Sequence, residues 1–273
     1  DTHQTGNSYL SPQTLPMIPG IEVVGTHAGK RYLASVSSGG YAQKAIAHTS
    51  VLFPIPDAVT DEQALCMLVQ GATAWHLLKT MGNLQKGQSV VVHAAAGGVG
   101  TIAIQLAKMW GGKVIAVTSS DAKAALAKSL GADITVDAQS SDLTAALREA
   151  NGGHGVDLVL EMVGGTTFDH SLAALGAFGK IITFGMASRT APTPIHPGAL
   201  MHGSKTVSGF WLANCFGSKE MLNDVVAQLF QLVADGKLKP VIGATYPLSE
   251  AADAHRSMLA RESTGKIALD PAR

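Results

Sequence analysis

Short β-rich runs alternate with helix-sized segments from residue 89 onward, and this alternation restricts the fold more than any other feature. The runs are apolar almost throughout, and they lie at 89–94, 113–119, 132–137, 156–163, 180–186 and 205–212. Helical patterns separate the first five, at 98–109, 121–130, 142–150 and 166–175. Apolar strands separated by helices are typical of a parallel sheet covered on both faces. The pattern therefore predicts an α/β fold with a doubly wound nucleotide-binding domain.

The chain before residue 60 has a different character, rich in Gly, Pro, Ser and Thr, with short irregular runs such as "RYLASVSSGGYAQKAIA". We expect a second, β-rich domain there. Thr60 and Gln63 have the spacing of a capping box, which predicts a linking helix at 61–81. Helices near 218–235 and 249–260 and a final strand, "KIALD", are expected to return to this domain. The predicted domains are 1–81 with 214–273, and 82–213.

The stretch "VVHAAAGGVGTIAIQLAKMWG", residues 91–111, joins the first of these strands to the first helix. Its spacing, Ala95-x-Gly97-x-x-Gly100, is the dinucleotide fingerprint with alanine at the first glycine position. The unpaired N–H groups of the helix's first turn, with the positive end of its dipole, form an anion site. We expect this turn to hold a pyrophosphate through Ala96, Gly97, Gly98 and Val99. The alternative is a tight turn needed only for packing.

Charge and cysteine content narrow the class of partner. The chain has 20 Lys+Arg and 20 Asp+Glu, and its pI is about 7.3, which argues against nucleic acid or an anionic membrane as a partner. Its apolar runs are far shorter than the ~20 residues that span a bilayer. Cys66 and Cys215 are widely separated, as in proteins of a reducing compartment. These features favour a cytoplasmic protein with a small-molecule partner.

Further motifs accompany the Gly-rich turn: "QGATAWHLL" (70–78), "VDLVLEMVGG", "GKIITFG", "GFWL" and "ESTGKIALDP". Together they resemble, over essentially the whole chain, the zinc-independent quinone oxidoreductase (zeta-crystallin-like) branch of the medium-chain dehydrogenase/reductase superfamily. The resemblance implies a GroES-like catalytic domain, a Rossmann domain, NADPH, a homodimer and reduction of quinones or related conjugated carbonyls. Family members carry a further N-terminal segment, so we expect sequence to precede Asp1.

Comparison with zinc-dependent members of the superfamily predicts that this chain uses no metal. Those members have a catalytic Cys and a Gly-His-Glu triplet, and many add a four-Cys loop. Here the matching triplet is Gly20-Ile21-Glu22, and two cysteines cannot form such a loop. The histidines show no close ligand spacing either.

Three candidate catalytic residues follow from the resemblance. Thr73 matches a family threonine beside the nicotinamide, with helix packing as the alternative. Tyr9 lies near the place of a donor tyrosine in enoyl-thioester reductases, and a phenol there would hydrogen-bond a carbonyl oxygen as charge develops. His3 takes the place of an aromatic cleft residue. The alternatives are an exposed loop tyrosine and a surface histidine.

The remaining candidate cofactor contacts follow the later strands. Val163 and Gly164, and the turn of Phe184, Gly185 and Met186, resemble family loops that pass under the cofactor. Phe210 and Trp211, with Leu212, come at the carboxyl edge of the last strand, where ligands bind in such sheets. Packing in the core or an interface is the alternative for these aromatic side chains.

The second strand, "KVIAVTSSDAK", indicates a preference for NADPH over NADH. NAD enzymes of this fold place an acid at its end to hold the ribose hydroxyls, and here Thr118 stands in that position. Ser119 and Ser120 follow as hydroxyl donors, and Lys123 lies one helical turn beyond. We expect these three residues to bind the 2′-phosphate, with ordinary helix capping as the alternative.

The function that these features favour is NADPH-dependent, metal-independent hydride transfer to a quinone or an α,β-unsaturated carbonyl. Two alternatives stay open. One is an enoyl-thioester reductase of the same superfamily, and the other is an NADPH-binding protein with a sensory or structural role and little turnover.

Overall fold

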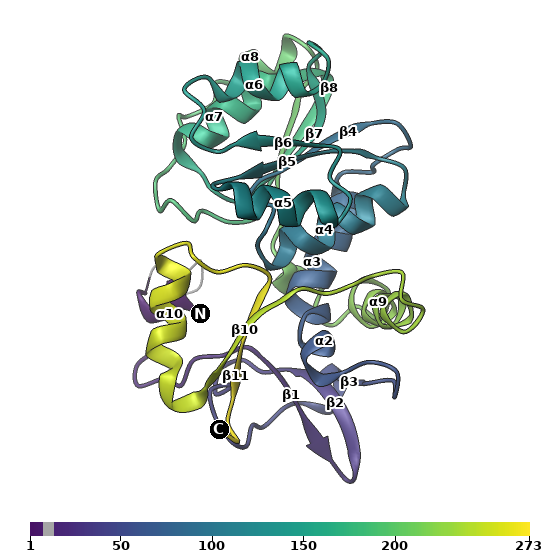
Figure 1. Ribbon diagram of the computed structural model, residues 1–273, viewed down its shortest axis with the longest axis vertical. Helices are drawn as coiled ribbons and strands as arrows, with labels where there is room; N and C mark the ends of the chain where they lie inside the picture. Colours follow the sequence, from purple (N-terminus) through teal and green to yellow (C-terminus); the bar gives the residue numbers. More distant parts are fainter. Residues whose placement is uncertain (8–13) are drawn as a thin grey trace. The chain divides into compact units, whose positions relative to one another are not determined.

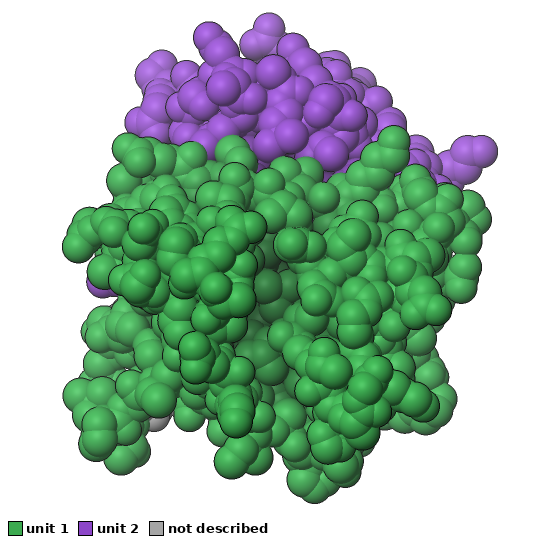
Figure 2. All heavy atoms as spheres, turned by 60° about the horizontal axis from the view of Figure 1, so that its bottom comes forward, with its two compact units in different colours: residues 1–72, 215–273 green, residues 73–214 purple. Residues whose placement is uncertain are grey.

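The computed structural model describes residues 1–7 and 14–273, which divide into two compact units (Figures 1 and 2). Unit 1 consists of Asp1–Ala72 and Cys215–Arg273, and unit 2 consists of Thr73–Asn214. Unit 2 contains a parallel sheet wound with helices, and unit 1 contains an antiparallel sheet. The predicted fold class, a doubly wound α/β domain plus a β-rich domain, is therefore confirmed.

Unit 2 is built on a six-stranded sheet in which all neighbouring strands run parallel. Its order is β6 (Ile134–Asp137), β5 (Lys113–Thr118), β4 (Ser89–Val92), β7 (Val156–Glu161), β8 (Leu175–Thr183) and β9 (Thr206–Gly209). All of β4 is buried, as expected for a strand covered on both faces. The strand order reverses between β4 and β7, and such a switch point is where ligands bind in open α/β sheets.

Helices cover both faces of this sheet (Figure 1). On one face lie α4 (Gly98–Met109) and α5 (Asp121–Ser129), and on the other α6 (Leu143–Ala150) and α7 (Gly165–Ala174). Leu147 and Phe168 from the second pair join a buried cluster with strand residues such as Val159. Burying a side chain of this size contributes about 1.5–3 kcal/mol. A short helix, α8 (Pro197–Met201), precedes β9, and a 3₁₀ turn, η4 (Leu212–Cys215), follows it.

Unit 1 contains a three-stranded antiparallel sheet of β1 (Glu22–His27), β2 (Lys30–Ser35) and β3 (Leu52–Pro54). Ala28 and Gly29 join the first two strands, and both have positive φ, 49° and 75°. Positive φ at both positions is the geometry of a tight hairpin whose twist matches that of its strands. A separate pair, β10 (Ile242–Pro247) and β11 (Lys266–Asp270), runs parallel.

Among its described residues, unit 1 contains the α-helices α1 (Thr2–Thr5), α2 (Asp61–Leu65), α9 (Asp224–Ala234) and α10 (Ala251–Leu259). Two 3₁₀ turns, η1 (Thr49–Val51) and η6 (Leu248–Glu250), and a π-helical segment, η5 (Lys219–Asn223), also belong to this unit. The capping box predicted at the start of α2 is confirmed. The Gln63 N–H donates to Thr60 Oγ1 at 3.2 Å, and the Thr60 N–H donates to Gln63 Oε1 at 3.0 Å.

The predicted helix over 61–81 is present but not uniformly α-helical. Two π-helical segments, η2 (Met67–Gly71) and η3 (Leu77–Met81), flank the α-helical turn α3 (Ala72–His76). Gly71 ends the first segment with an N–H that donates to Cys66 O at 2.9 Å. A Cβ on Gly71 would lie 2.9 Å from Leu229 Cδ1, so glycine allows α9 to pack closely there. Widened turns of this kind often mark functional sites.

The main differences from the prediction concern element boundaries. The strand predicted at 180–186 begins at Leu175, directly after α7, and ends at Thr183. Residues 176–179, Gly-Ala-Phe-Gly, look like a turn in the sequence, but they lie inside β8 as an irregularity in its pairing with β7, with Phe178 at a φ of 60°. The predicted strand over 205–212 is limited to Thr206–Gly209. Neither α8 nor β10 was predicted, because both contain Gly and Pro, which are typical of loops.

Candidate functional site

Apart from Thr73, the candidate cofactor residues of unit 2 follow the carboxyl ends of five strands. They come after β4 (Ala96, Gly97, Gly98, Val99), β5 (Ser119, Ser120, Lys123), β7 (Val163, Gly164), β8 (Phe184, Gly185, Met186) and β9 (Phe210, Trp211, Leu212). Because these strands are parallel neighbours, their carboxyl ends meet at one edge of the sheet. Residues spread over more than a hundred positions of the sequence thus lie along one edge.

The Gly-rich turn after β4 is tightly folded. Ala94 has a φ of 46°, and its carbonyl oxygen accepts from the Gly97 N–H at 2.8 Å. A Cβ on Gly100 would lie 2.6 Å from that oxygen, so a side chain there would displace the turn. Gly97 is the N-cap of α4 and has no side chain that accepts from the first turn. The N–H groups of the first turn therefore receive no acceptor from the N-cap side chain, which is the arrangement at helix N-termini that bind anions.

The serines after β5 were interpreted either as ligands of the 2′-phosphate or as helix caps, and the structure is compatible with both. Ser120 Oγ accepts from the Lys123 N–H at 3.4 Å, which makes Ser120 the N-cap of α5. Ser119 and Ser120 are exposed and Lys123 is half-buried. Thr118, in the place of the ribose-binding acid, is buried at the end of β5. Helix capping by Ser120 leaves its hydroxyl hydrogen available to donate.

The loops after β7 and β8 approach each other closely. Gly164 has a φ of 80°, in the left-handed region that favours glycine. A Cβ there would lie 2.9 Å from both Met186 Cγ and Thr190 O. Gly164 therefore meets a conformational and a steric requirement together, and the Val163-Gly164 loop lies against the Met186 turn.

Thr73 and Phe210 occupy different environments within unit 2. Thr73 lies in α3 and its side chain is 7% exposed. Phe210 is half-buried, and its ring packs on the His76 ring at a centroid distance of 5.6 Å. The Phe210 N–H donates to Thr183 O at 2.8 Å, which extends the pairing of β8 and β9 beyond Gly209. Of its two neighbours, Leu212 is buried and Trp211 is half-buried.

Two of the candidate catalytic residues, His3 and Tyr9, belong to unit 1. His3 lies in α1 and is half-buried. Tyr9 lies outside the described residues. Their proposed roles remain predictions from the resemblance.

Two buried ionisable residues at this edge were not predicted. His93 follows β4, and its Nε2 lies 2.8 Å from Ser171 Oγ. Burial lowers the pKa of His93 to about 4, so the ring is neutral at physiological pH. Glu161 ends β7, and burial raises the pKa of its carboxyl group, while N–H groups from Gly164, Val163 and Met162 oppose that rise. The sequence signal that could have identified both residues is a polar side chain within an apolar run.

Glu22, the last residue of the Gly20-Ile21-Glu22 triplet, is bonded to other residues of this chain. Its carboxylate pairs with the Lys266 ammonium and accepts from the Val69 N–H at 3.1 Å. Gln70 Oε1 accepts from Lys266 at 3.2 Å. Burial lowers the pKa of Lys266 to about 7, and the Glu22 carboxylate opposes this by favouring the ammonium. Within residues 1–7 and 14–273, no three His, Cys, Asp or Glu side chains cluster as metal ligands would.

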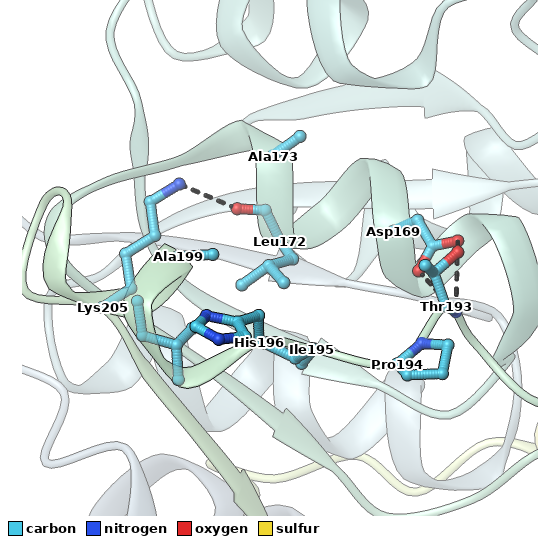
Figure 3. Close-up of a pocket in the computed structure, with 10 residues that line it drawn as sticks. Asp169, Leu172, Ala173, Thr193, Pro194, Ile195, His196, Ala199 and Lys205 are labelled. Atoms are coloured by element: carbon cyan, nitrogen blue, oxygen red, sulfur yellow. Dashed lines mark hydrogen bonds between the residues drawn. The ribbon is translucent and has the colours of Figure 1, made fainter.

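A pocket of about 520 Å³ lies elsewhere in unit 2, between α7 and the segment before β9 (Figure 3). Asp169 accepts from the Thr193 Oγ1 hydroxyl at 2.7 Å on one side, and Lys205 donates to Leu172 O at 3.1 Å on the other. None of the candidate site residues lines it. This pocket and the sheet edge with the candidate cofactor residues are therefore separate features of unit 2.

Comparison with known proteins places the chain in a family. Residues 98–232 match the family described as zinc-binding dehydrogenase. A quinone oxidoreductase of Pseudomonas aeruginosa is 33% identical over 254 residues, which cover 92% of this chain and 78% of the relative. The chain belongs to the quinone oxidoreductase branch of the medium-chain dehydrogenase/reductase superfamily.

The chain is also similar to a human protein and to a solved bacterial structure. The human synaptic vesicle membrane protein VAT-1 homolog is 31% identical and covers 94% of this chain, which spans 72% of that relative. The solved quinone oxidoreductase of Thermus thermophilus, described with its NADPH complex, shares 34% identity and a TM-score of 0.88, with 98% of this chain and 85% of that chain covered. The chain is therefore an oxidoreductase of this superfamily.

Among the described helices, none combines the length and apolar character needed to cross a bilayer.

Proposed function

We propose that this chain is an NADPH-dependent reductase that transfers hydride to a quinone or an α,β-unsaturated carbonyl without a metal. One observation carries the proposal: the glycine-rich turn and the candidate contacts after four further strands lie at one edge of the parallel sheet. The NADPH complex described for the Thermus thermophilus relative supports the choice of cofactor.

The local geometry fits a dinucleotide. The N-terminus of α4 carries N–H groups that no N-cap side chain satisfies, and Gly97 at the N-cap has no side chain that would keep a pyrophosphate from them. Gly98 and Val99 would bind it through these N–H groups, with Ala96 and Gly97 beside them, because the Gly97 N–H already donates to Ala94 O. Ser119, Ser120 and Lys123 would bind the 2′-phosphate at the end of β5.

The chain's remaining contribution is positioning. Bound NADPH supplies a hydride, and solvent can protonate the enolate or quinol oxygen, so the protein needs no strict acid. In this proposal Thr73 orients the nicotinamide, and Val163, Phe184 and Phe210 with their neighbours form its surroundings. Tyr9 is the candidate donor to the acceptor's oxygen, and His3 is the candidate for the aromatic residue of the substrate cleft.

Metal independence rests on two residues. Ile21 stands where zinc-dependent members have histidine, and the neighbouring Glu22 is paired with Lys266. An aliphatic side chain cannot ligate zinc. We therefore expect that prolonged treatment with a chelator leaves turnover unchanged.

The experiment that tests this function compares acceptors. NADPH oxidation is measured with 1,4-benzoquinone, with a simple enone and with crotonyl-CoA, after subtraction of the uncatalysed rate. Turnover with the quinone or enone above that with crotonyl-CoA is expected. Preference for crotonyl-CoA would instead identify an enoyl-thioester reductase. NADPH binding without turnover of any acceptor would indicate a sensory or structural protein.

A further inference from the structure

Glu161 is a buried acid at the end of β7 that takes no part in the proposed chemistry. It is 0% exposed, and burial raises the pKa of its carboxyl group. Burying an ionisable group is costly unless hydrogen bonds compensate. The hydrogen bonds that Glu161 makes therefore indicate what its side chain does.

The Glu161 carboxylate binds the backbone that follows its own strand. Its Oε1 accepts from the Val163 N–H at 2.7 Å and from the Gly164 N–H at 3.0 Å, and its Oε2 lies 3.2 Å from the same Gly164 nitrogen. Val163 and Gly164 are proposed cofactor contacts. The carboxylate thus folds the chain back at the carboxyl edge of the sheet, where the proposed cofactor site lies.

A second segment is attached to this loop by backbone hydrogen bonds. The Ala187 N–H donates to Met162 O, the Ser188 N–H donates to Val163 O, and the Gly165 N–H donates to Thr190 O, each at 2.9 Å. We call residues 162–165 and 184–190 the paired loops. They contain all five candidate contacts that follow β7 and β8, so one arrangement of backbone sets the position of all five.

The pairing leaves little room for another arrangement. The positive φ of Gly164 and the 2.9 Å approach of its would-be Cβ to Thr190 O show how closely the loops pack. If the carboxylate were lost, the N–H groups of Val163 and Gly164 would lose their acceptor. A buried donor without a partner favours conformations in which it reaches water.

We propose that Glu161 is a positioning residue for the cofactor, which holds the paired loops in the binding conformation before NADPH arrives. This inference rests on the proposed function. A variant whose loops adopt this conformation one tenth of the time binds NADPH about tenfold more weakly, although no contact is lost. Saturating NADPH restores the conformation, so turnover at saturation changes little.

Two variants on one strand separate positioning from stability. Glu161→Gln keeps the shape of the side chain and one acceptor oxygen, but it removes the charge and places an amide group that cannot accept near the Gly164 N–H. Asp157→Asn is the matched control at the opposite end of β7. The Asp157 carboxylate also accepts a backbone hydrogen bond, from the Ser89 N–H at 2.8 Å.

The measurements are the Kd for NADPH by fluorescence titration, kcat with 1,4-benzoquinone at saturating NADPH, and amide hydrogen exchange in the cofactor-free protein. For Glu161→Gln we expect a Kd about tenfold higher, a kcat within about twofold of wild type, and faster exchange in the paired loops. For Asp157→Asn we expect Kd, and exchange in the paired loops, to match wild type. Should Glu161→Gln not fold, Glu161→Asp, which keeps the charge but shortens the reach, is measured in the same way and expected to shift in the same direction.

The outcomes distinguish this inference from the proposed function. A wild-type chain that does not bind NADPH contradicts the proposed function. If the wild type binds NADPH, equal Kd values for wild type and the Glu161 variant contradict the inference alone. Equal losses in the Glu161 and Asp157 variants contradict it as well, because they would reflect general destabilisation.

Discussion

At the scale of single residues, the site depends on side chains whose chemistry is separable from their packing. Thr73 is the simplest example, because it is buried in α3 and yet proposed to contact the nicotinamide. Valine has nearly the same volume as threonine but lacks the hydroxyl. The change Thr73→Val therefore removes one hydrogen-bonding group with little effect on packing volume.

We expect Thr73→Val to lower kcat at saturating substrate by roughly 2- to 12-fold, which corresponds to a hydrogen bond of about 0.5–1.5 kcal/mol. Steady-state kinetics and thermal unfolding of the two proteins test this. Unchanged kinetics would mean that Thr73 serves only in helix packing.

Lys123 tests the proposed 2′-phosphate site. A charge-assisted hydrogen bond contributes about 1.5–3 kcal/mol, so Lys123→Ala should weaken NADPH binding by roughly 10- to 150-fold. NADH lacks the 2′-phosphate, and its affinity should change little. Titrations of both proteins with both cofactors provide the measurement. Equal losses for the two cofactors, or a wild type that prefers NADH, would contradict a phosphate site at this position.

His93 makes stability depend on pH. Its pKa is lowered from 6.5 to about 4 by burial, so the unfolded chain binds a proton that the folded chain does not between these values. Stability is then lost as pH falls from about 6.5 toward 4, by up to about 3 kcal/mol. Urea unfolding at several pH values should show this slope in wild type and a smaller slope in His93→Gln. Identical slopes would show that His93 does not titrate as described.

At the scale of elements, β9 forms one edge of the unit 2 sheet. It is the last strand of the sheet in order, and part of it is exposed. An open, β-prone edge is a liability unless it is paired or covered. Pairing with the same strand of a second copy across a twofold axis would remove that edge.

We therefore predict a homodimer. Sedimentation equilibrium at micromolar concentration is expected to give twice the mass of the chain, 28.1 kDa per copy. A monomer under these conditions would leave β9 without the proposed partner.

The elements also show what local sequence can predict. The helix predicted at 98–109 coincides with α4, because its periodic apolar positions and the glycine at its start are local signals. The start of β8 was missed because the Gly-Ala-Phe-Gly run at 176–179 looks like a turn, whereas it is an irregularity within the strand. The π-helical segments within 61–81 were also missed, since the same apolar residues suit either kind of helical turn.

At the scale of the whole molecule, the parallel topology could be predicted, and with it the edge where strand ends gather. What the sequence could not show is which backbone groups meet there. The bonds from Ala187 and Ser188 to the loop after β7 join segments about 25 residues apart and involve only main-chain atoms. Glu161 looked like a polar interruption of an apolar strand, and its role depends on those tertiary contacts.

The central claim is that one edge of the unit 2 sheet binds NADPH. A crystal structure of the chain with NADPH tests it most directly. We predict the pyrophosphate on the N–H groups of Gly98 and Val99, next to Gly97, and the 2′-phosphate within hydrogen-bonding distance of Lys123. NADPH bound away from the glycine-rich turn, for example in the pocket between α7 and the segment before β9, would contradict the claim.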